Sequence, residues 1–478
     1  MAKIKVLLEV EPPQAEQPEG FSAFREAIAS EPAALGQALP GLDLVAGLGV
    51  EPDENFVPVP MFGTAPEGER EAHEPLGALR EFAVPETNPD IAPTSVVLPV
   101  EVSPTQLAEL GEREGVRVWP NSPLHLFHHE EEQGVNEPGA VPGAEVEANA
   151  FDLARSRAGL DCRPFRPGVT VATVRALLGV ERPWRDGFRG QNIVVGIVDE
   201  GVNGQVYPVS GGFTSPGATL QPGAAPITSH GSMCAADILV AAPAARLYDY
   251  PFLGRPDSGT ALTMFQAILE HRRLDGTPQL TNNSYGYTGV PRRELDPHHE
   301  IWAINHPMHR KVREVVASGA AAFFAAGNCG AQCPSGNCRR SGIGPGRSIH
   351  ASNSLAEVIT VAAVNSRQER VGYSSQGPGM FEEGKPDFAS YSHLFGNFGP
   401  GRPGGLDQPF DNGTSAATPV AAGVGALLLS AFPELTPEGL REALLAGLVN
   451  PTGKAWDPGY GRGIVNAAAS YSFLLRKA

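Results

Sequence analysis

The fold of this chain is predicted best by the stretch Asn412-Gly413-Thr414-Ser415-Ala416-Ala417-Thr418-Pro419, which the apolar run from Val420 to Leu429 follows. A serine after a Gly-Thr turn stands at the start of a helix that we expect to be buried on all sides. The first turn of a helix has unpaired N–H groups and a positive dipole end, which suits an oxygen that becomes negative. The Gly413 turn would let the Ser415 hydroxyl face a cleft. Serine at a helix start is also a common N-cap, so this stretch alone leaves both interpretations open.

Three further segments carry a chemically useful side chain at the end of a predicted element. The apolar, β-branched run 192–198 predicts a buried parallel strand, and Asp199 follows it. His230 opens an apolar helix, and Asn328 comes just after a second predicted strand at 320–326. Open α/β sheets bind ligands at the carboxyl ends of their strands, where such side chains would lie.

These four segments, in the order Asp, His, Asn and Ser, resemble the motifs of the subtilisin-like serine proteases, the subtilase family. The resemblance covers roughly Val180 to Ala469 and includes weaker matches at 373–378, 385–389 and 459–468. It implies an α/β fold, a doubly wound parallel sheet flanked by helices, and hydrolysis of protein or peptide substrates. It also implies that catalysis requires no cofactor. Structural calcium is frequent in the family, but no acidic cluster here can be assigned to it.

The resemblance gives each of the four side chains a role. Ser415 would attack the peptide carbonyl, and His230 would take its proton and pass it to the leaving amine. Asp199 would fix the imidazole tautomer and stabilise its charged form. Asn328 would donate its amide to the oxyanion together with the Ser415 N–H, and losing one such donor typically costs about 10²–10³ in turnover. Without the resemblance, the same aspartate, histidine and asparagine would be ordinary turn or cap residues.

A substrate-binding wall follows from the same resemblance. Residues 282–286, Asn-Asn-Ser-Tyr-Gly, resemble the strand that pairs with the substrate backbone and forms one side of the S1 pocket. Short Ser-Tyr-Gly strings also occur in ordinary loops. The residues expected to contact substrate are Ser284, Tyr285, Gly286, Ala326 and Gly327.

Two departures from the family pattern lie near the expected site. Glu200 stands where a small hydroxyl residue is usual, and its charge should raise the pKa of His230 by favouring the imidazolium. Ser232 replaces a threonine, which is a mild change. Cys234 lies one turn after His230, and a small buried apolar residue is its simplest interpretation.

The cysteine-rich loop after Asn328 leaves three interpretations open. Cys329, Cys333 and Cys338 could bind a metal with a fourth ligand such as His350, although their spacing does not match a paired zinc module. A disulfide, most naturally Cys329 or Cys333 with Cys338, is the second interpretation. Three reduced thiols beside the cleft are the third. The resemblance to subtilases implies that the residue after the oxyanion asparagine helps shape the S1 pocket, so Cys329 is expected to bear on substrate selectivity.

Length and charge limit the class of protein. With 478 residues, two domains are the natural expectation. The formal net charge of -17 argues against nucleic acid or an anionic membrane as a partner. The N-terminal residues do not resemble a secretory signal, and the five cysteines are an odd number, so a reducing cytoplasm is expected.

Residues 1–128 are expected to form a separate α+β domain of ferredoxin-like architecture. Its predicted elements are strands at 3–10, 94–102 and 115–126 and helices at 20–30 and 103–112, with mostly loops at 51–93. By order and position this unit resembles the inhibitory prodomain of subtilases, an intramolecular inhibitor.

An acidic, Gly/Pro-rich linker at 129–150 separates that unit from a catalytic domain at 151–478. Self-cleavage, if it occurs, should fall around Phe127 to Gly134. Two alternatives stay open. One is a subtilase-fold regulatory or binding protein with little turnover, and the other is an active protease whose N-terminal domain permanently recognises a partner.

Overall fold

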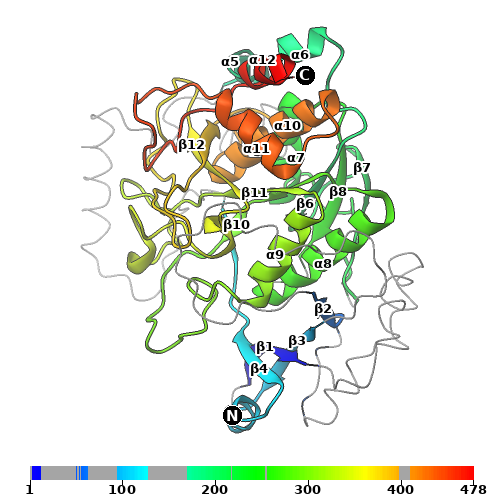
Figure 1. Cartoon of the computed structure of the whole chain (residues 1–478), viewed down its shortest axis with the longest axis vertical. Helices are drawn as coiled ribbons and strands as arrows, with labels where there is room; N and C mark the ends of the chain where they lie inside the picture. Colours follow the sequence, from blue (N-terminus) through cyan, green and yellow to red (C-terminus); the bar gives the residue numbers. More distant parts are fainter. Residues whose placement is uncertain are drawn as a thin grey trace.

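The computed structural model describes residues 3–11, 50, 53, 55–62, 94–127, 169–216, 218–252, 254, 256–397 and 410–477. A large α/β unit lies above a small sheet that contains the N-terminal strand, and the C-terminal helix lies at the far end of the molecule (Figure 1). The helix predicted at 20–30, the linker at 129–150 and residues 151–168 of the predicted catalytic domain lie outside the described residues.

Seven parallel strands form the central sheet of the large unit. In spatial order they are β13 (Phe388–Tyr391), β12 (Ile359–Val364), β11 (Ala321–Ala325), β9 (Leu280–Asn283), β6 (Val194–Asp199), β8 (Arg246–Pro251) and β7 (Val209–Gly212). Every residue of β6 is buried, which is typical of a parallel strand covered on both faces. The parallel sheet flanked by helices that the sequence predicts is therefore confirmed.

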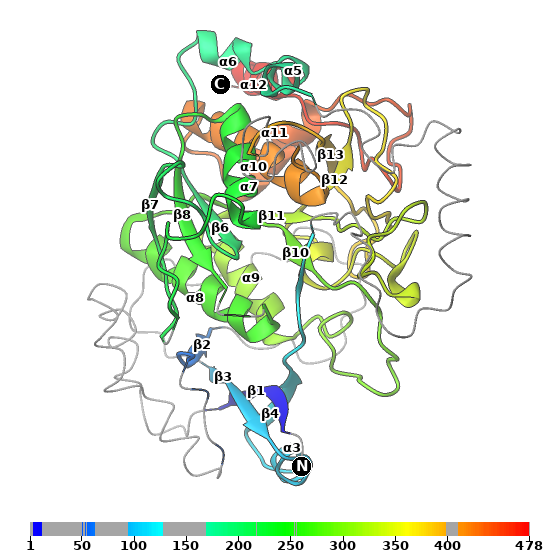
Figure 2. The same cartoon turned by 180° about the vertical axis from the view of Figure 1, so that it is seen from behind.

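Helices cover both faces of this sheet (Figures 1 and 2). Adjacent side chains of one strand point to opposite faces: Phe323 of β11 packs in the core on the α10 side, whereas Phe324 packs against Phe265 of α8. The helices of this unit are α5 (Val171–Leu178), α6 (Glu181–Arg185), α7 (His230–Ala241), α8 (Ser258–Asp275), α9 (Pro307–Ala317), α10 (Thr414–Ala431), α11 (Pro437–Ala446) and α12 (Ala467–Lys477).

Helix α10 is the only described helix that is long and apolar enough to cross a membrane, and 89% of it is buried inside the fold. Its sequence, rich in alanine, glycine and leucine, lets it pack closely against α7 and the strands β9, β11, β12 and β13. It is therefore the central core helix of this unit, as expected for the apolar run after Ser415.

The small N-terminal sheet is antiparallel and has the order β2-β3-β1-β4. Its strands are β1 (Ile4–Val10), β2 (Val59–Met61), β3 (Ser95–Val102) and β4 (Val116–Pro120), and α3 (Pro104–Gly111) connects β3 to β4. Helix α3 begins with a capping box in which the Ser103 side chain accepts from the Gln106 N–H and the Gln106 side chain accepts from the Ser103 N–H. Because the helix predicted at 20–30 is not described, the ferredoxin-like architecture stays a prediction.

Two details of this small sheet differ from the sequence analysis. Strand β2 lies in a region expected to be mostly loops; it is an edge strand, where Pro60 removes no hydrogen bond from the sheet interior. The single strand predicted at 115–126 divides into β4 and the two-residue strand β5 (His125–Leu126), and β5 leaves the small sheet to pair with β10 (Tyr285–Gly286).

The small sheet rests on helices α8 and α9 of the large unit. Leu262 of α8 lies in one apolar cluster with Leu7 and Val59 from the sheet. Beside this cluster, Arg310 of α9 pairs with the buried Glu9 carboxylate at 2.5 Å, and Glu9 also accepts from Trp119 Nε1 at 2.8 Å. Beyond β4, the chain runs from this contact region up to β10 (Figure 2).

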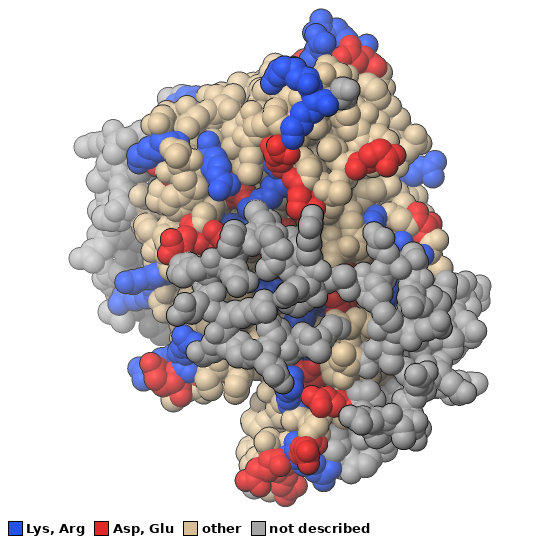
Figure 3. Space-filling view, in the orientation of Figure 1, with Lys and Arg blue, Asp and Glu red and all other residues tan. Residues whose placement is uncertain are grey.

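Charges of both signs are mixed over the face that Figure 3 shows, with uncharged surface between them. On the described residues of that face, Asp and Glu side chains lie among the Lys and Arg side chains.

Candidate active site

Asp199 and His230 lie side by side at the carboxyl edge of the sheet. Asp199 is the last residue of β6 and His230 the first of α7. His230 Nδ1 lies 2.8 Å from Asp199 Oδ1 and 2.9 Å from Oδ2, and both side chains are buried. An ionised carboxylate can only accept hydrogen bonds, so this contact favours the proton on Nδ1 and leaves Nε2 as the basic nitrogen.

The Asp199 carboxylate is held by two further donors. Its Oδ1 accepts from the Glu200 N–H at 2.8 Å, and the thiol of Cys234 lies 3.7 Å from Oδ2. Burial raises the pKa of the Cys234 thiol well above its usual value, so the sulfur keeps its proton and acts as a donor. Asp199, His230 and Cys234 are also the one group among the described residues whose ligand atoms lie close enough for a metal ion. A protonated thiol is a poor ligand, which favours the simpler interpretation of Cys234 as a small buried residue.

The electrostatic effect expected of Glu200 is confirmed in its direction. Burial lowers the pKa of His230, but the charges of Asp199 and Glu200 outweigh it, and the pKa is raised overall. The Glu200 carboxylate also accepts from the His230 backbone N–H at 2.5 Å, at the first turn of α7. An anion at a helix N-terminus satisfies an unpaired donor there, so Glu200 both caps α7 and stabilises the imidazolium.

Ser415 is the second residue of α10 and is completely buried. Pro419, four residues later, has no N–H to donate to the Ser415 carbonyl. That carbonyl instead accepts from Ser284 Oγ at 3.4 Å and lies 3.6 Å from the Cys234 sulfur. The Ser415 hydroxyl donates to the Ser284 carbonyl at 3.2 Å. The helix start and the segment after β9 are thereby locked together.

A glycine turn directs the chain into α10 at this point. Gly413 has a φ of 81° and a ψ of 172°, a backbone conformation that side chains with a Cβ rarely adopt. Its N–H donates to the Tyr373 hydroxyl at 2.8 Å, and its carbonyl accepts from Ser392 Oγ at 2.9 Å. These two buried contacts fix the turn that precedes Ser415.

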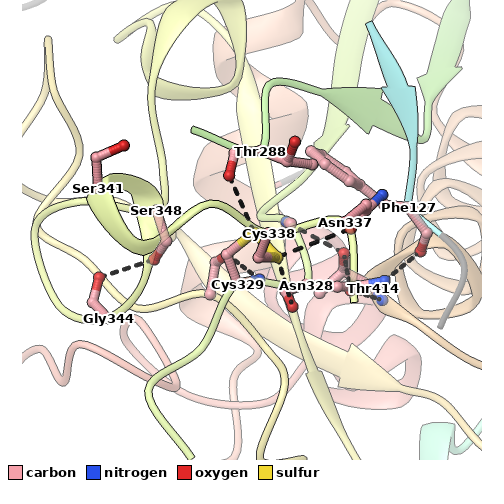
Figure 4. Close-up of a disulfide and its surroundings, with 12 residues drawn as sticks. Phe127, Thr288, Asn328, Cys329, Asn337, Cys338, Ser341, Gly344, Ser348 and Thr414 are labelled. Carbon is pink, nitrogen blue, oxygen red and sulfur yellow. Dashed lines mark hydrogen bonds between the residues drawn. A yellow bond between two sulfur atoms is a disulfide. The ribbon is translucent and has the colours of Figure 1, made fainter. Parts of the chain in front are cut away.

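Asn328 is oriented through its side-chain oxygen. The Thr414 N–H and the Thr414 hydroxyl both donate to Asn328 Oδ1 at 2.9 Å (Figure 4). A backbone N–H can only donate, so this contact identifies the oxygen of the amide and leaves Nδ2 pointing the other way. Nδ2 donates to the carbonyl oxygen of Phe127 at 2.6 Å.

Phe127 belongs to the extended segment that follows the N-terminal sheet. Its N–H donates to the Ser284 carbonyl at 3.0 Å, and Leu126 and His125 pair antiparallel with Tyr285 and Gly286. The Phe127 side chain is 4% exposed. The sequence analysis named Phe127 only as the start of a region for cleavage, because a pairing across more than 150 residues leaves no local signal.

Two glycines make room for the Phe127 ring. A Cβ on Gly286 would lie 2.6 Å from Phe127 Cζ, and one on Gly327 would lie 3.4 Å from the same atom. Ala326 is buried beside Gly327 and donates its N–H to Val361 in the neighbouring strand. Gly286 and Gly327, two of the residues expected to contact substrate, therefore border this ring through their main chain alone.

Tyr285 contacts the segment before Phe127 through its main chain, which pairs with Leu126. Its ring is buried in the core on the α8 side, edge-on to Phe252 and Phe324, and its hydroxyl donates to Asn283 Oδ1 at 3.2 Å. The sequence analysis also missed Asn353, which donates to the carbonyls of both Tyr285 and Ala325 at 2.8 Å and so ties β10 to β11. Asn353 lies in the short 3-10 helix Ala351–Ser354, and one asparagine in a single turn carries no sequence pattern that reveals such a bridge.

The cysteine loop contains a disulfide between Cys329 and Cys338. This confirms one of the pairings considered from the sequence. A sulfur in a disulfide has no thiolate to offer, so a metal site built on these cysteines does not fit. His350, the other ligand considered, is buried, and burial lowers its pKa to about 4.

An Asp–His pair, a buried serine at a helix start and an amide donor thus converge at the carboxyl edge of a parallel sheet, as in a serine hydrolase. Residues 190–463, more than half of the chain, match the subtilase family. The chain belongs to this family of subtilisin-like serine peptidases, which hydrolyse peptide bonds and need no cofactor for catalysis.

Two curated relatives illustrate the similarity. The chain is 26% identical to subtilisin DY of Bacillus licheniformis over 303 residues, which cover 62% of this chain and 96% of the relative. It is 27% identical to the serine protease AprX of Bacillus subtilis strain 168 over 274 residues, 50% of this chain and 57% of that protein.

Among solved structures, fervidolysin from Fervidobacterium pennivorans, described as a keratinolytic enzyme related to subtilisin, shares the fold. The match has a TM-score of 0.55 at 16% identity and covers 98% of this chain and 61% of that one.

Proposed function

We propose that this subtilase is a serine endopeptidase that uses Ser415, His230, Asp199 and Asn328, and that its N-terminal domain restrains it by filling the substrate cleft. The observation that carries the proposal is the 2.6 Å contact between Asn328 Nδ2 and the Phe127 carbonyl. An amide donor aimed at a peptide carbonyl is the contact that an oxyanion hole makes with its substrate.

The reaction would proceed in two stages at these atoms. Ser415 Oγ attacks the carbonyl carbon while His230 Nε2 takes its proton, and the charged imidazole is held by Asp199 through Nδ1. Asn328 Nδ2 donates to the oxygen as it becomes negative. His230 then gives its proton to the leaving amine, and water releases the acyl group from Ser415 by the same steps in reverse order. Asp199 stays ionised throughout.

The segment 122–127 supports the proposal because it is bound in the manner of a substrate. Its Leu126 and His125 add a short antiparallel strand to β10, and the Phe127 N–H bonds to the Ser284 carbonyl. Strand addition gives affinity through the main chain, and the buried Phe127 ring would give selectivity. We therefore infer that the Phe127–His128 peptide bond is the one presented for self-cleavage, and that substrates with an aromatic residue before the cleaved bond are preferred.

The contacts of the N-terminal sheet explain how such a segment would be retained after a cut. Glu9 and Arg310 form a buried pair, and Lys311 Nζ donates to the Pro60 carbonyl at 2.6 Å. The completely buried Glu300 carboxylate accepts from the Ser122 hydroxyl at 2.8 Å. Buried, hydrogen-bonded charges at an interface are costly to separate from their partners, so release would be slow.

The test combines active-site labelling with kinetics. The wild type should gain one fluorophosphonate adduct and Ser415→Ala none. Asn328→Ala should lose about 10²–10³ in kcat on a peptide substrate with little change in KM. Asn337→Ala, an exposed asparagine in the following loop, is the matched control and should behave as wild type. A wild type that neither labels nor turns over, even as residues 150–478 alone, would favour a binding protein with this fold and end the proposal.

A further inference from the structure

The disulfide between Cys329 and Cys338 begins at the residue directly after Asn328. It closes a loop between positions nine residues apart, and this loop lies next to the Phe127 carbonyl and the Asn328 amide (Figure 4). None of the four proposed catalytic side chains forms part of this covalent bond. Its place beside the oxyanion donor therefore needs a separate explanation.

The loop folds back onto the main chain of Asn328. The Asn328 carbonyl accepts from the Ser335 N–H at 2.9 Å, and the Cys338 sulfur lies 3.5 Å from the same oxygen. The Cys338 N–H in turn donates to the Ser335 carbonyl at 2.9 Å. Thr414 fixes the side chain of Asn328, whereas the closed loop fixes its main chain on the following side.

The far end of the loop reaches the substrate-pairing segment after β10. The Arg339 N–H donates to the Thr288 carbonyl at 2.8 Å, and the Cys329 sulfur lies 3.9 Å from this oxygen. Thr288 follows Gly286, the glycine beside the Phe127 ring. The loop that the disulfide closes therefore contacts both the segment that carries the oxyanion donor and, through the Arg339 N–H, the segment that pairs with substrate.

We propose that the Cys329–Cys338 disulfide positions Asn328 for catalysis and makes turnover depend on the redox state of this bond. The inference rests on the proposed role of Asn328. A dithiol reductant would break the S–S bond and supply two electrons and two protons, leaving two thiols in the protein and a cyclic disulfide in the reductant. Cys338 is only partly buried and Cys329 is 2% exposed, so the reductant's thiolate attacks the Cys338 sulfur and Cys329 leaves.

Opening the bond restores conformational freedom to the loop, since a cross-link limits the states that the chain between its ends can adopt. The Asn328 amide is then held from one side only, and an oxyanion donor that moves loses part of its effect on turnover. Disulfides persist in oxidising compartments and are reduced in the cytosol. The enzyme would therefore turn over slowly in a reducing compartment and reach full activity where the bond forms.

The test measures kcat and KM of the wild type before and after treatment with dithiothreitol, with the redox state read by thiol alkylation and mass spectrometry. Rates are divided by the fraction of protein that a fluorophosphonate labels after long incubation, which removes any loss through unfolding. Reduction should lower kcat at least tenfold and change KM less than twofold. The variant Cys329→Ser/Cys338→Ser should have the low kcat without reductant and no further response to it.

Cys333 is disulfide-bonded as well, so dithiothreitol acts on its bond too. Cys333→Ser is therefore the matched control: it removes that second bond and should keep the fall in kcat on reduction. The inference would be overturned if the double variant kept the full kcat. It would also be overturned if the wild type kept the full kcat once alkylation showed that Cys329 and Cys338 were both reduced. A response to dithiothreitol that disappears in Cys333→Ser but persists in the double variant would overturn it as well. Failure of the oxidised wild type to label or turn over would instead count against the proposed function.

Discussion

Replacing Gly286 with alanine should remove the space that the ring of an aromatic substrate residue needs. The added Cβ would lie 2.6 Å from Phe127 Cζ and 2.9 Å from Cε2, and 3.0 Å from Asn353 Oδ1. Contacts below 3 Å to a ring that main-chain hydrogen bonds hold on one side force the ring out. Gly286 is in β10 and is not among the glycines with positive φ, so alanine itself suits the backbone.

The size of the effect follows from the burial of the ring. The Phe127 side chain is 4% exposed, and burying a phenylalanine fully is worth about 1.5–3 kcal/mol. Losing this contribution in the transition state corresponds to a fall of about 10- to 150-fold in kcat/KM, at about 1.4 kcal/mol for each factor of ten. A substrate with alanine at the same position does not fill the space that the Phe127 ring occupies, so its kcat/KM should fall little in Gly286→Ala.

The assay compares two peptides that differ only in the residue before the cleaved bond, phenylalanine or alanine. Gly286→Ala should lower the Phe/Ala ratio of kcat/KM by the factor above and slow cleavage after Phe127 in its own chain. Gly384→Ala is the control, because its Cβ would meet its nearest neighbour at an ordinary 3.4 Å. An unchanged Phe/Ala ratio in Gly286→Ala would refute the assignment of this space to the substrate side chain.

Three other outcomes are expected. Glu200→Gln should lower the pKa of His230 and move the acid limb of kcat/KM to lower pH, since the base must be neutral; a limb that stays in place contradicts this. Glu9→Gln removes the charge that faces the nearly buried Arg310 guanidinium; losing one partner of a buried pair can cost about 3–5 kcal/mol, so the full-length chain should hydrolyse peptide sooner than wild type. Glu11 belongs to a half-exposed ion pair, so Glu11→Gln should hydrolyse peptide no sooner than wild type. Equal rates of peptide hydrolysis in the two variants would count against restraint by the N-terminal domain. Burial raises the pKa of Asp249 to about 6, so its contribution to stability is full below about pH 4 and lost as pH rises through 6. In an inactive background, Asp249→Asn should remove about 3 kcal/mol of this pH dependence of unfolding, and identical pH slopes would speak against it.

The sequence predicted the large unit well because its signals are local. Buried strands before Asp199 and Asn328 are continuous apolar runs, and parallel strands bring their carboxyl ends to one edge. The helix after Ser415 was equally plain, since a Gly-Thr turn leads into a long apolar run. These signals suffice to bring the four side chains near one another.

Features that depend on distant pairings could not be predicted in the same way. The position of Phe127 depends on β5 pairing with β10, whereas the preceding strand β4 pairs with β1 in the small sheet. No residue between 115 and 126 indicates that the two strands pair with different sheets. The cysteine spacing left a metal, a disulfide and free thiols open, because Sγ positions depend on how the loop folds onto Asn328.

The measurement that tests the central claim most directly is the intact mass of purified full-length wild type and Ser415→Ala over time. The account predicts that the wild type divides into two fragments, with the break between Phe127 and His128, while Ser415→Ala stays whole. A wild type that reacts with a fluorophosphonate but is never cut would leave the N-terminal domain as a permanent module and contradict the account. The same break appearing in Ser415→Ala would also contradict it, because another protease would then be responsible.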